Sequence, residues 1–305
     1  GYALSAAFEI DSRPKPYLRF NASFTSELDE EAMDITDPPI SRVFVDYTIA
    51  DSISFRAGTF DMTWGSARVL TNIANIVSDI SDGIALRGVA PLGTGTVTGV
   101  AYSNETWVND FGPENPKAFA YAVNIEQTLQ AFAVEAAARA RSAEFEAPED
   151  AVTEVTGAVF TGVGEFDLTV EGINRVNRLD PAASENIDFE ILSQVIWEGG
   201  DPTWVIAAEH LYDYAVPDFR GHRAGFSVRM PRFSLLGVNW RPQVRVRHAF
   251  EDQSGDIVTG LSGTVAPDVT MTLGLPLRYG PPESTYRSGT FGDDLQNLGG
   301  VAAVG

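Results

Sequence analysis

Carboxylates and guanidiniums supply most of the side chains in this sequence that could do chemistry. The chain of 305 residues has 42 acidic residues and 21 Lys or Arg residues, which gives a formal net charge of −21. Cysteine is absent, and this excludes thiolate metal sites, cysteine nucleophiles and disulfides. The acidic balance also makes nucleic acid a poor partner, because binding to phosphate needs basic patches.

Histidine is the other side chain that could transfer protons or bind a metal, and it occurs at His210, His222 and His248. A serine hydrolase would need a Ser–His pair with an orienting Asn or Asp. Ser193 or Ser227 could lie opposite a histidine, but nothing in the spacing requires it. We therefore expect no enzyme, no cofactor and no metal site.

The charged residues recur on one parity of a two-residue alternation, as expected for the wall of a water-filled channel. Arginines prevail near both ends of the chain: Arg19, Arg42, Arg56, Arg87, Arg229, Arg245, Arg247 and Arg278. Acids prevail in the middle: Glu126, Asp167, Glu171, Asp188, Glu190, Glu209 and Asp213. In a closed cylinder these would form a basic wall facing an acidic wall, and the field between them would order polar solutes. The alternative is that the charges pair structurally across strands.

The elements that must position these charges are strands of about ten residues with one apolar and one polar face. For example, Leu18, Phe20 and Ala22 alternate with Arg19 and Asn21. We identify about sixteen such segments, joined by alternately short and long connections. No apolar run approaches the ~18 residues that a membrane-spanning helix needs. Short turns near residues 51–52 and 93–95 contrast with long connections near 28–39 and 105–116.

The apolar parity predicts a face turned toward lipid. Its members are Val43, Val45, Tyr47, Ile49, Phe119, Tyr121, Val123, Ile125, Ile187, Phe189, Ile191, Val269, Met271, Leu273 and Leu275. Aromatic residues near strand ends are candidates for interfacial girdles: Trp64, Trp107, Trp197, Trp204, Tyr212 and Tyr279. In a soluble sandwich the same aromatics would belong to a core.

One long connection has its own pattern. In residues 65–82 the apolar residues recur at helical spacing, which predicts a short amphipathic helix near 66–81. The helix could fold inward and narrow a pore, or it could cap the outer rim or meet a partner. If it folds inward, the candidate constriction residues are Asn72, Asn75, Asp79 and Asp82.

The strand that ends at Trp64-Gly65, the long loop after it, the paired hairpins and the charged inner parity resemble porin-type outer-membrane β-barrels of diderm bacteria. The resemblance covers most of the chain and is architectural, because no short motif here is specific to one porin family. It implies passive uptake of small hydrophilic solutes. It also implies that an inward loop and charged wall residues set the constriction.

Together these observations predict an all-β fold in which residues 1–305 form a single antiparallel transmembrane β-barrel of about 16–18 strands. Because the first connection is short, we expect the barrel to be incomplete at one or both termini. The predicted function is an outer-membrane porin or channel for passive diffusion of small hydrophilic solutes or ions. Its expected surroundings are outer-membrane lipid, and the sequence leaves open a homo-oligomer or an envelope-protein partner.

Two other functions compete with the channel. One is a structural or interaction barrel whose lumen is blocked and whose outer loops bind partner proteins. The other is a soluble all-β protein built of large sandwiches. Conductance separates the channel from the blocked barrel, and dependence on detergent separates both of them from the soluble protein.

Overall fold

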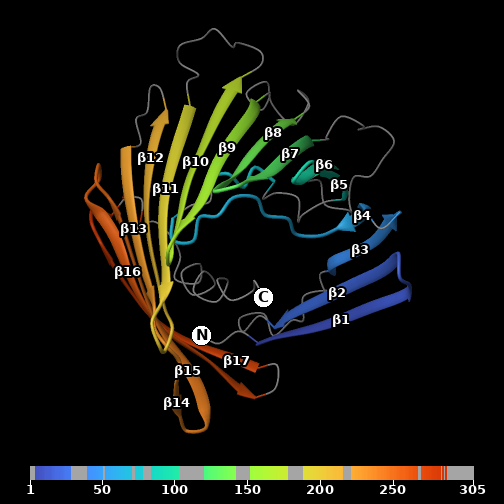
Figure 1. The fold of residues 1–305 in the computed structure, drawn as a ribbon. Coiled ribbons are helices and arrows are strands. Elements are labelled where there is room, and N and C mark those ends of the chain that lie inside the picture. Colours follow the sequence, from blue (N-terminus) through green and yellow to red (C-terminus); the bar gives the residue numbers. More distant parts are fainter. Residues whose placement is uncertain are drawn as a thin grey trace. The chain divides into compact units, whose positions relative to one another are not determined.

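The structure, a computed structural model, describes residues 4–28, 40–50, 52–70, 73–77, 84–103, 120–141, 152–177, 188–215, 221–266, 269–282, 284 and 286 (Figure 1). These residues form seventeen β-strands and no helix. The strands are β1 (Leu4–Lys15), β2 (Leu18–Leu28), β3 (Ile40–Ile49), β4 (Ile53–Thr59), β5 (Ala85–Leu92), β6 (Gly95–Tyr102), β7 (Ala120–Leu129), β8 (Phe132–Arg141), β9 (Val152–Val163), β10 (Phe166–Asn177), β11 (Asp188–Gly199), β12 (Trp204–Ala215), β13 (Gly221–Arg229), β14 (Phe233–Leu235), β15 (Val238–Ala249), β16 (Ser254–Ala266) and β17 (Val269–Tyr279).

The strands belong to two compact units. Unit 1 consists of Gly1–Trp64, Asn75–Gly157 and Arg175–Ala183, and unit 2 consists of Gly65–Ala74, Ala158–Asn174 and Ser184–Gly305. In unit 1, each strand from β1 to β8 pairs antiparallel with the next. In unit 2, the antiparallel order is β11, β12, β13, β15, β16 and β17, with β14 paired to β15.

The short connections are tight turns that require unusual backbone angles. Gly93 lies between β5 and β6 with a φ of 60°, and Gly164 lies between β9 and β10 with a φ of 64°. Glycine adopts positive φ without steric cost, which allows the two-residue turns that antiparallel hairpins favour. The strands that follow these turns therefore return beside their predecessors, and charges on the two strands can meet.

The predicted all-β fold is confirmed, and seventeen strands fall within the predicted number. Closure of the sheet into a cylinder, the treatment of residues 1–305 as a single domain and the incomplete termini stay predictions. No helix among the described residues is both long and apolar enough to cross a membrane.

The predicted helix near 66–81 is wrong for the residues described there. Residues 65–70 and 73–77 form bends, turns and irregular chain, and Figure 1 draws the segment after β4 as an irregular light-blue tube. Residues 71–72 and 78–80, with Asp79 among them, lie outside the described part of the chain. The apolar residues of the pattern are buried, as a helix would also bury them: Val69, Ile73, Ile76 and Val77. The helical spacing therefore indicated correctly which side chains are buried, but the backbone N–H groups donate to acceptors outside the segment.

Candidate functional site: the polar face of the sheet

Burial in this chain is inverted relative to a soluble protein. In β11, Glu190, Leu192 and Gln194 are buried, whereas Ile191 and Val195, which point to the opposite face, are exposed. The large exposed apolar side chains include nine of those predicted to face lipid: Tyr47, Ile49, Tyr121, Val123, Ile125, Ile191, Met271, Leu273 and Leu275. Fully buried carboxylates are rare in soluble proteins unless they are paired. We call the side that carries the charges the polar face and the opposite side the apolar face.

The aromatic residues predicted to form interfacial girdles differ in their outcomes. Trp204 and Tyr279 are exposed near strand ends, as predicted for girdle residues. Trp64 is buried, and its backbone N–H donates to Asn75 Oδ1 at 3.1 Å, so its assignment to a girdle is wrong. It belongs to the packed irregular segment instead. Trp107 lies outside the described residues.

In unit 1, a row of charges crosses four neighbouring strands. The register places Arg19 opposite Asp46, Asp46 opposite Arg56, and Arg56 opposite Arg87. Arg56 donates to both carboxylate oxygens of Asp46 at 2.6 and 2.9 Å, and its guanidinium lies 3.9 Å from the ring centroid of Phe44. Arg19 reaches Asp46 at 3.9 Å. The structure thus brings together three of the predicted arginines. Arg19 and Arg56 pair with Asp46 across strands, and Arg87 lies opposite Arg56.

Two acids of unit 1 that pair with arginines were not predicted from the sequence. Arg19 donates to both carboxylate oxygens of Asp11 at 3.1 and 2.8 Å. Arg139 is buried, bonds to Glu154 and donates to the hydroxyl of Tyr102 at 2.9 Å. Asp11 lies on the polar parity of its own strand, so the alternation could have identified it. The partners of Arg139 come from other strands, and the sequence has no signal for them.

In unit 2, carboxylates of the polar face hold the irregular segment of residues 65–70, which we call the seated loop. Glu209, which is only 4% exposed, accepts hydrogen bonds from the backbone N–H groups of Arg68 (2.5 Å), Val69 (2.9 Å) and Leu70 (2.6 Å). Gln194 also donates to Glu209, at 2.7 Å. In a helix beginning at residue 66, the N–H of Leu70 would donate to the carbonyl of residue 66, but here it donates to Glu209. This is the physical reason that the helix prediction fails here.

A second carboxylate and a glycine also contact the seated loop. Glu171 accepts from the N–H and the hydroxyl of Ser66 at 2.6 and 2.7 Å. A Cβ on Gly225 would lie 2.7 Å from Val69 Cγ1, so this position accepts the loop only because it has no side chain. Val69 packs against Ile196 and Ala207. The loop therefore lies on the polar face of β10, β11, β12 and β13.

The cross-strand register of unit 2 sorts the polar face into rows. One row contains Gln194, Glu209, Gly225, Arg247, Asp256 and Arg278 as successive partners, at the level of the seated loop. Within this row, Arg247 donates to both oxygens of Asp256 at 2.8 and 2.6 Å. In the neighbouring rows, on the side of residues 216–220, Arg223 donates to Asp213 at 2.6 Å. Asp256 also lies 3.5 Å from Arg245.

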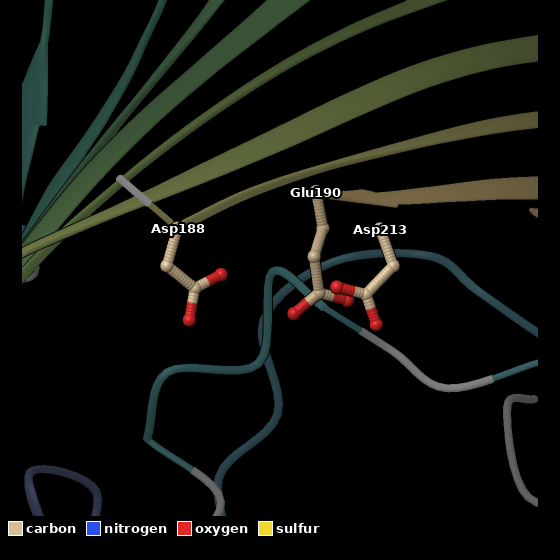
Figure 2. A group of neighbouring side chains, drawn as sticks. All are labelled: Asp188, Glu190 and Asp213. Carbon is tan, nitrogen blue, oxygen red and sulfur yellow. The ribbon is translucent and has the colours of Figure 1, made fainter. Parts of the chain in front are cut away.

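Three acids cluster at the same end of unit 2. Carboxylate oxygens of Asp188, Glu190 and Asp213 lie within 4.8 Å of one another, and Figure 2 shows the three side chains on the same side of the strands. Glu190 and Asp213 are direct register partners. Oxygen ligands suit hard cations such as Ca²⁺. However, Arg223 already neutralises Asp213, and Asp188 and Glu190 have further interactions of their own.

The remaining predicted residues are scattered. Glu126 and Asp167 are exposed near the short turns, and Arg42 is exposed and bonds to Asp61. Asn75 accepts the Trp64 N–H, as described above. Asn72, Asp79 and Asp82 lie outside the described residues, so their role in a constriction stays a prediction.

The histidines lie on the apolar face. His210 Nε2 and His222 Nδ1 are 3.1 Å apart with their rings stacked, and His248 Nδ1 is 3.0 Å from the hydroxyl of Tyr279. Ser193 is the register partner of His210, the arrangement considered for a hydrolase. A Ser–His pair needs an acid beside the histidine to orient its ring. This pair lies on the apolar face, and the buried carboxylates lie on the polar face.

Comparisons with known proteins agree with this geometry. No known protein family and no curated sequence matches the chain. Among solved structures, OccK5 (OpdH) of Pseudomonas aeruginosa is similar with a TM-score of 0.59 and 7% identity, over 91% of this chain and 87% of that one. A variant of the porin of Rhodopseudomonas blastica is similar with a TM-score of 0.50 and 9% identity, over 91% and 89% of the two chains. The described part of the chain, seventeen antiparallel strands with one apolar and one charged face, therefore has the fold of the outer-membrane porins.

Proposed function

We propose that this protein is an outer-membrane channel through which small hydrophilic solutes or ions diffuse passively. The observation that carries the proposal is the inverted burial: apolar side chains are exposed on one face, while carboxylates and guanidiniums fill the other. A bilayer would cover the apolar face, and enclosed water would solvate the polar face. Charged groups at membrane depth are tolerated where they line a water-filled cavity.

The seated loop supports a channel that is narrowed by the protein itself. Glu171 and Glu209 fix residues 65–70 against the polar face through hydrogen bonds to backbone donors. A segment held there would reduce the cross-section available to solutes. The charges beside it, such as Arg247 and Asp256, would then act on solutes at short range.

The location we propose is the bacterial outer membrane, with lipid as the partner of the apolar face. The porin fold favours this location, since its known members are outer-membrane proteins. The exposure of large side chains such as Leu275, at 61%, fits contact with acyl chains better than contact with water.

The test is conductance of the purified, folded protein in a planar lipid bilayer. Stepwise current increments that scale with salt concentration are expected from a water-filled channel. Folding is checked independently by heat-modifiable migration in gels and by the need for detergent. A folded, detergent-dependent protein that gives no current would overturn the channel and leave the blocked barrel that binds partners. A monodisperse protein without detergent would overturn both.

A further inference from the structure

The β14–β15 hairpin of unit 2 continues past its pairing with the neighbouring strands, on the side of the short turns. The register of β12 against β13 ends at Arg229, and that of β15 against β16 ends at Trp240. Beyond these positions the chain pairs with itself across the hairpin, and Figure 1 draws it as a separate orange projection. Residues 232–237, which we call the hairpin tip, are all exposed.

The exposed side chains of the hairpin tip are largely apolar. Phe233 is 42% exposed, Leu235 52% and Leu236 93%. The register partners of the first two are Trp240 and Val238, which have the parity of the apolar face on β15. The apolar face of the sheet therefore continues onto the hairpin and ends in a leucine that stands almost clear of the chain.

Leu236 occupies this position at a backbone angle that disfavours it. Its φ is 56° and that of Gly237 is 76°, the pair of positive values typical of a two-residue hairpin turn. Asn or Gly adopts this angle readily, whereas a leucine is strained there. Trp240 Nε1 donates to the carbonyl of Leu235 at 3.2 Å and helps to fix the turn. A leucine that is both strained and exposed points to an apolar medium outside the chain.

The hairpin is also basic, in contrast to the chain as a whole. Residues 229–241 contain three arginines and no acid, whereas the whole chain has 42 acids and 21 Lys or Arg residues. Arg232 is exposed directly before β14, and its charge repels that of Arg241. Glu198 attracts Arg241, so negative charge is already close to that arginine. Arg232 is the arginine that lies on the tip itself, next to its apolar side chains.

We propose that the hairpin tip inserts Leu236 into the lipid leaflet beside the short turns and binds anionic phospholipid headgroups through Arg232. This goes beyond the passage of solutes, and it rests on the membrane location proposed above. A surface that combines exposed apolar side chains with positive charge fits an anionic leaflet, because burial of the former and attraction of the latter act together.

Three features favour lipid over another protein as the occupant. The tip continues the face that a bilayer would cover. Trp240, at the base of the tip, is of the residue type that gathers where acyl chains meet headgroups. An arginine beside such a tip can keep its aliphatic stem among apolar groups while its guanidinium reaches a headgroup phosphate.

The test uses lipid-borne quenchers. The chain lacks cysteine, so Ser234→Cys places a single fluorophore on the tip while Leu236 and Arg232 remain. The labelled full chain is reconstituted into vesicles of phosphatidylcholine and phosphatidylglycerol, in which one lipid or the other carries a nitroxide near its headgroup. Quenching should exceed that of a label at Asp201→Cys, which is exposed on the short turn between β11 and β12. Phosphatidylglycerol should be enriched about fivefold over phosphatidylcholine around the tip, the effect of one arginine at an anionic surface.

Variants of the two proposed contacts are made in the Ser234→Cys background. Arg232→Gln should reduce the enrichment to about onefold, and Arg232→Lys should preserve it because the charge remains. Leu236→Asn suits the turn better than leucine does, so the hairpin should persist. The ratio of inserted to free tips should nevertheless fall about tenfold, because the apolar anchor is gone.

Three results would overturn the proposal. One is quenching at residue 234 no greater than at residue 201, while a label at Leu275→Cys on the apolar face is quenched; the tip then lies in water or on another protein. Another is the formation of disulfide-linked dimers by unlabelled Ser234→Cys in the vesicles, which would identify a second copy as the occupant. The third is an absence of phosphatidylglycerol enrichment, or an enrichment that survives Arg232→Gln.

Bilayer recordings separate this proposal from the channel. A protein that conducts while its tip is unquenched remains a channel without the lipid contact. A protein whose tip is quenched but which carries no current keeps the lipid contact and loses the channel. If the labels at residues 234 and 275 are both unquenched, the membrane location fails and this proposal fails with it.

Discussion

Replacing Glu209 by Gln should release the seated loop from the polar face. The carboxylate accepts three backbone N–H groups, at 2.5, 2.9 and 2.6 Å, and all three bonds are charge-assisted. Hydrogen bonds to a charged group contribute about 1.5–3 kcal/mol each and neutral ones about 0.5–1.5 kcal/mol. Gln keeps one acceptor oxygen and turns an NH₂ group toward donors, so we expect a loss of about 2–4 kcal/mol in the free energy that holds the loop.

The absence of cysteine makes this loss measurable. Val69 of the seated loop is buried against the sheet, and a single Val69→Cys substitution places a thiol there. A small, charged methanethiosulfonate reagent reacts with this thiol only when the loop opens, so its rate follows the open fraction. A loss of about 2–4 kcal/mol raises that fraction about 30- to 700-fold. In the same cysteine background, Gly225→Val should act in the same direction, because its Cβ would lie 3.0 Å from the side chain of Leu70 in the loop.

The control in the same cysteine background is Asp201→Asn, which removes a carboxylate from an exposed short turn. Its labelling rate should equal that of Val69→Cys alone. If Glu209→Gln leaves the rate within about twofold, well below the shift worked out above, the carboxylate does not hold the loop and the reasoning is refuted.

Three other predictions follow from the same structure. Leu275→Arg should destabilise the folded protein in lipid by about 2–4 kcal/mol, whereas Thr94→Arg at an exposed turn should not; equal urea midpoints for the two would place the apolar face in water. Arg139→Ala should cost about 3 kcal/mol of unfolding free energy, because among the described residues it leaves the buried Glu154 with Arg175, at 3.5 Å, as its one basic partner; a cost below about 1 kcal/mol contradicts this pairing. Burial raises the pKa of Tyr286 despite the nearby Arg247 guanidinium, so the native state holds the phenolic proton more tightly than the unfolded state. Stability should therefore fall as the pH rises above about 10, and Tyr286→Phe should lose that part of the pH dependence; an unchanged profile contradicts it.

Much of the fold could be predicted from local alternation. Leu18, Phe20 and Ala22 alternate with polar residues, and a period of two requires no knowledge of distant contacts. The same parity identified Glu209 and Asp213 as residues of the charged face, and both are buried there. The helical spacing of Val69, Ile73 and Ile76 was misleading, because it records which side chains are buried and not how the backbone is bonded.

The partners of the charged residues could not be predicted in the same way. Ser66 meets Glu171 across 105 positions, and Arg68 meets Glu209 across 141. The sequence did not identify Arg68 or Arg241 as residues of the charged face, because Arg68 lies in an irregular loop and Arg241 precedes a proline.

The sequence by itself determined that strands form, which side chains share a face and that one face carries the charge. These properties come from the two-residue period of a strand, which each segment expresses independently of its neighbours. Only the tertiary structure decided which charges are paired, which cluster and which hold the loop. Those outcomes depend on strand register and on contacts between residues far apart in the chain, and a shift of the register would change every pair while leaving the alternation intact.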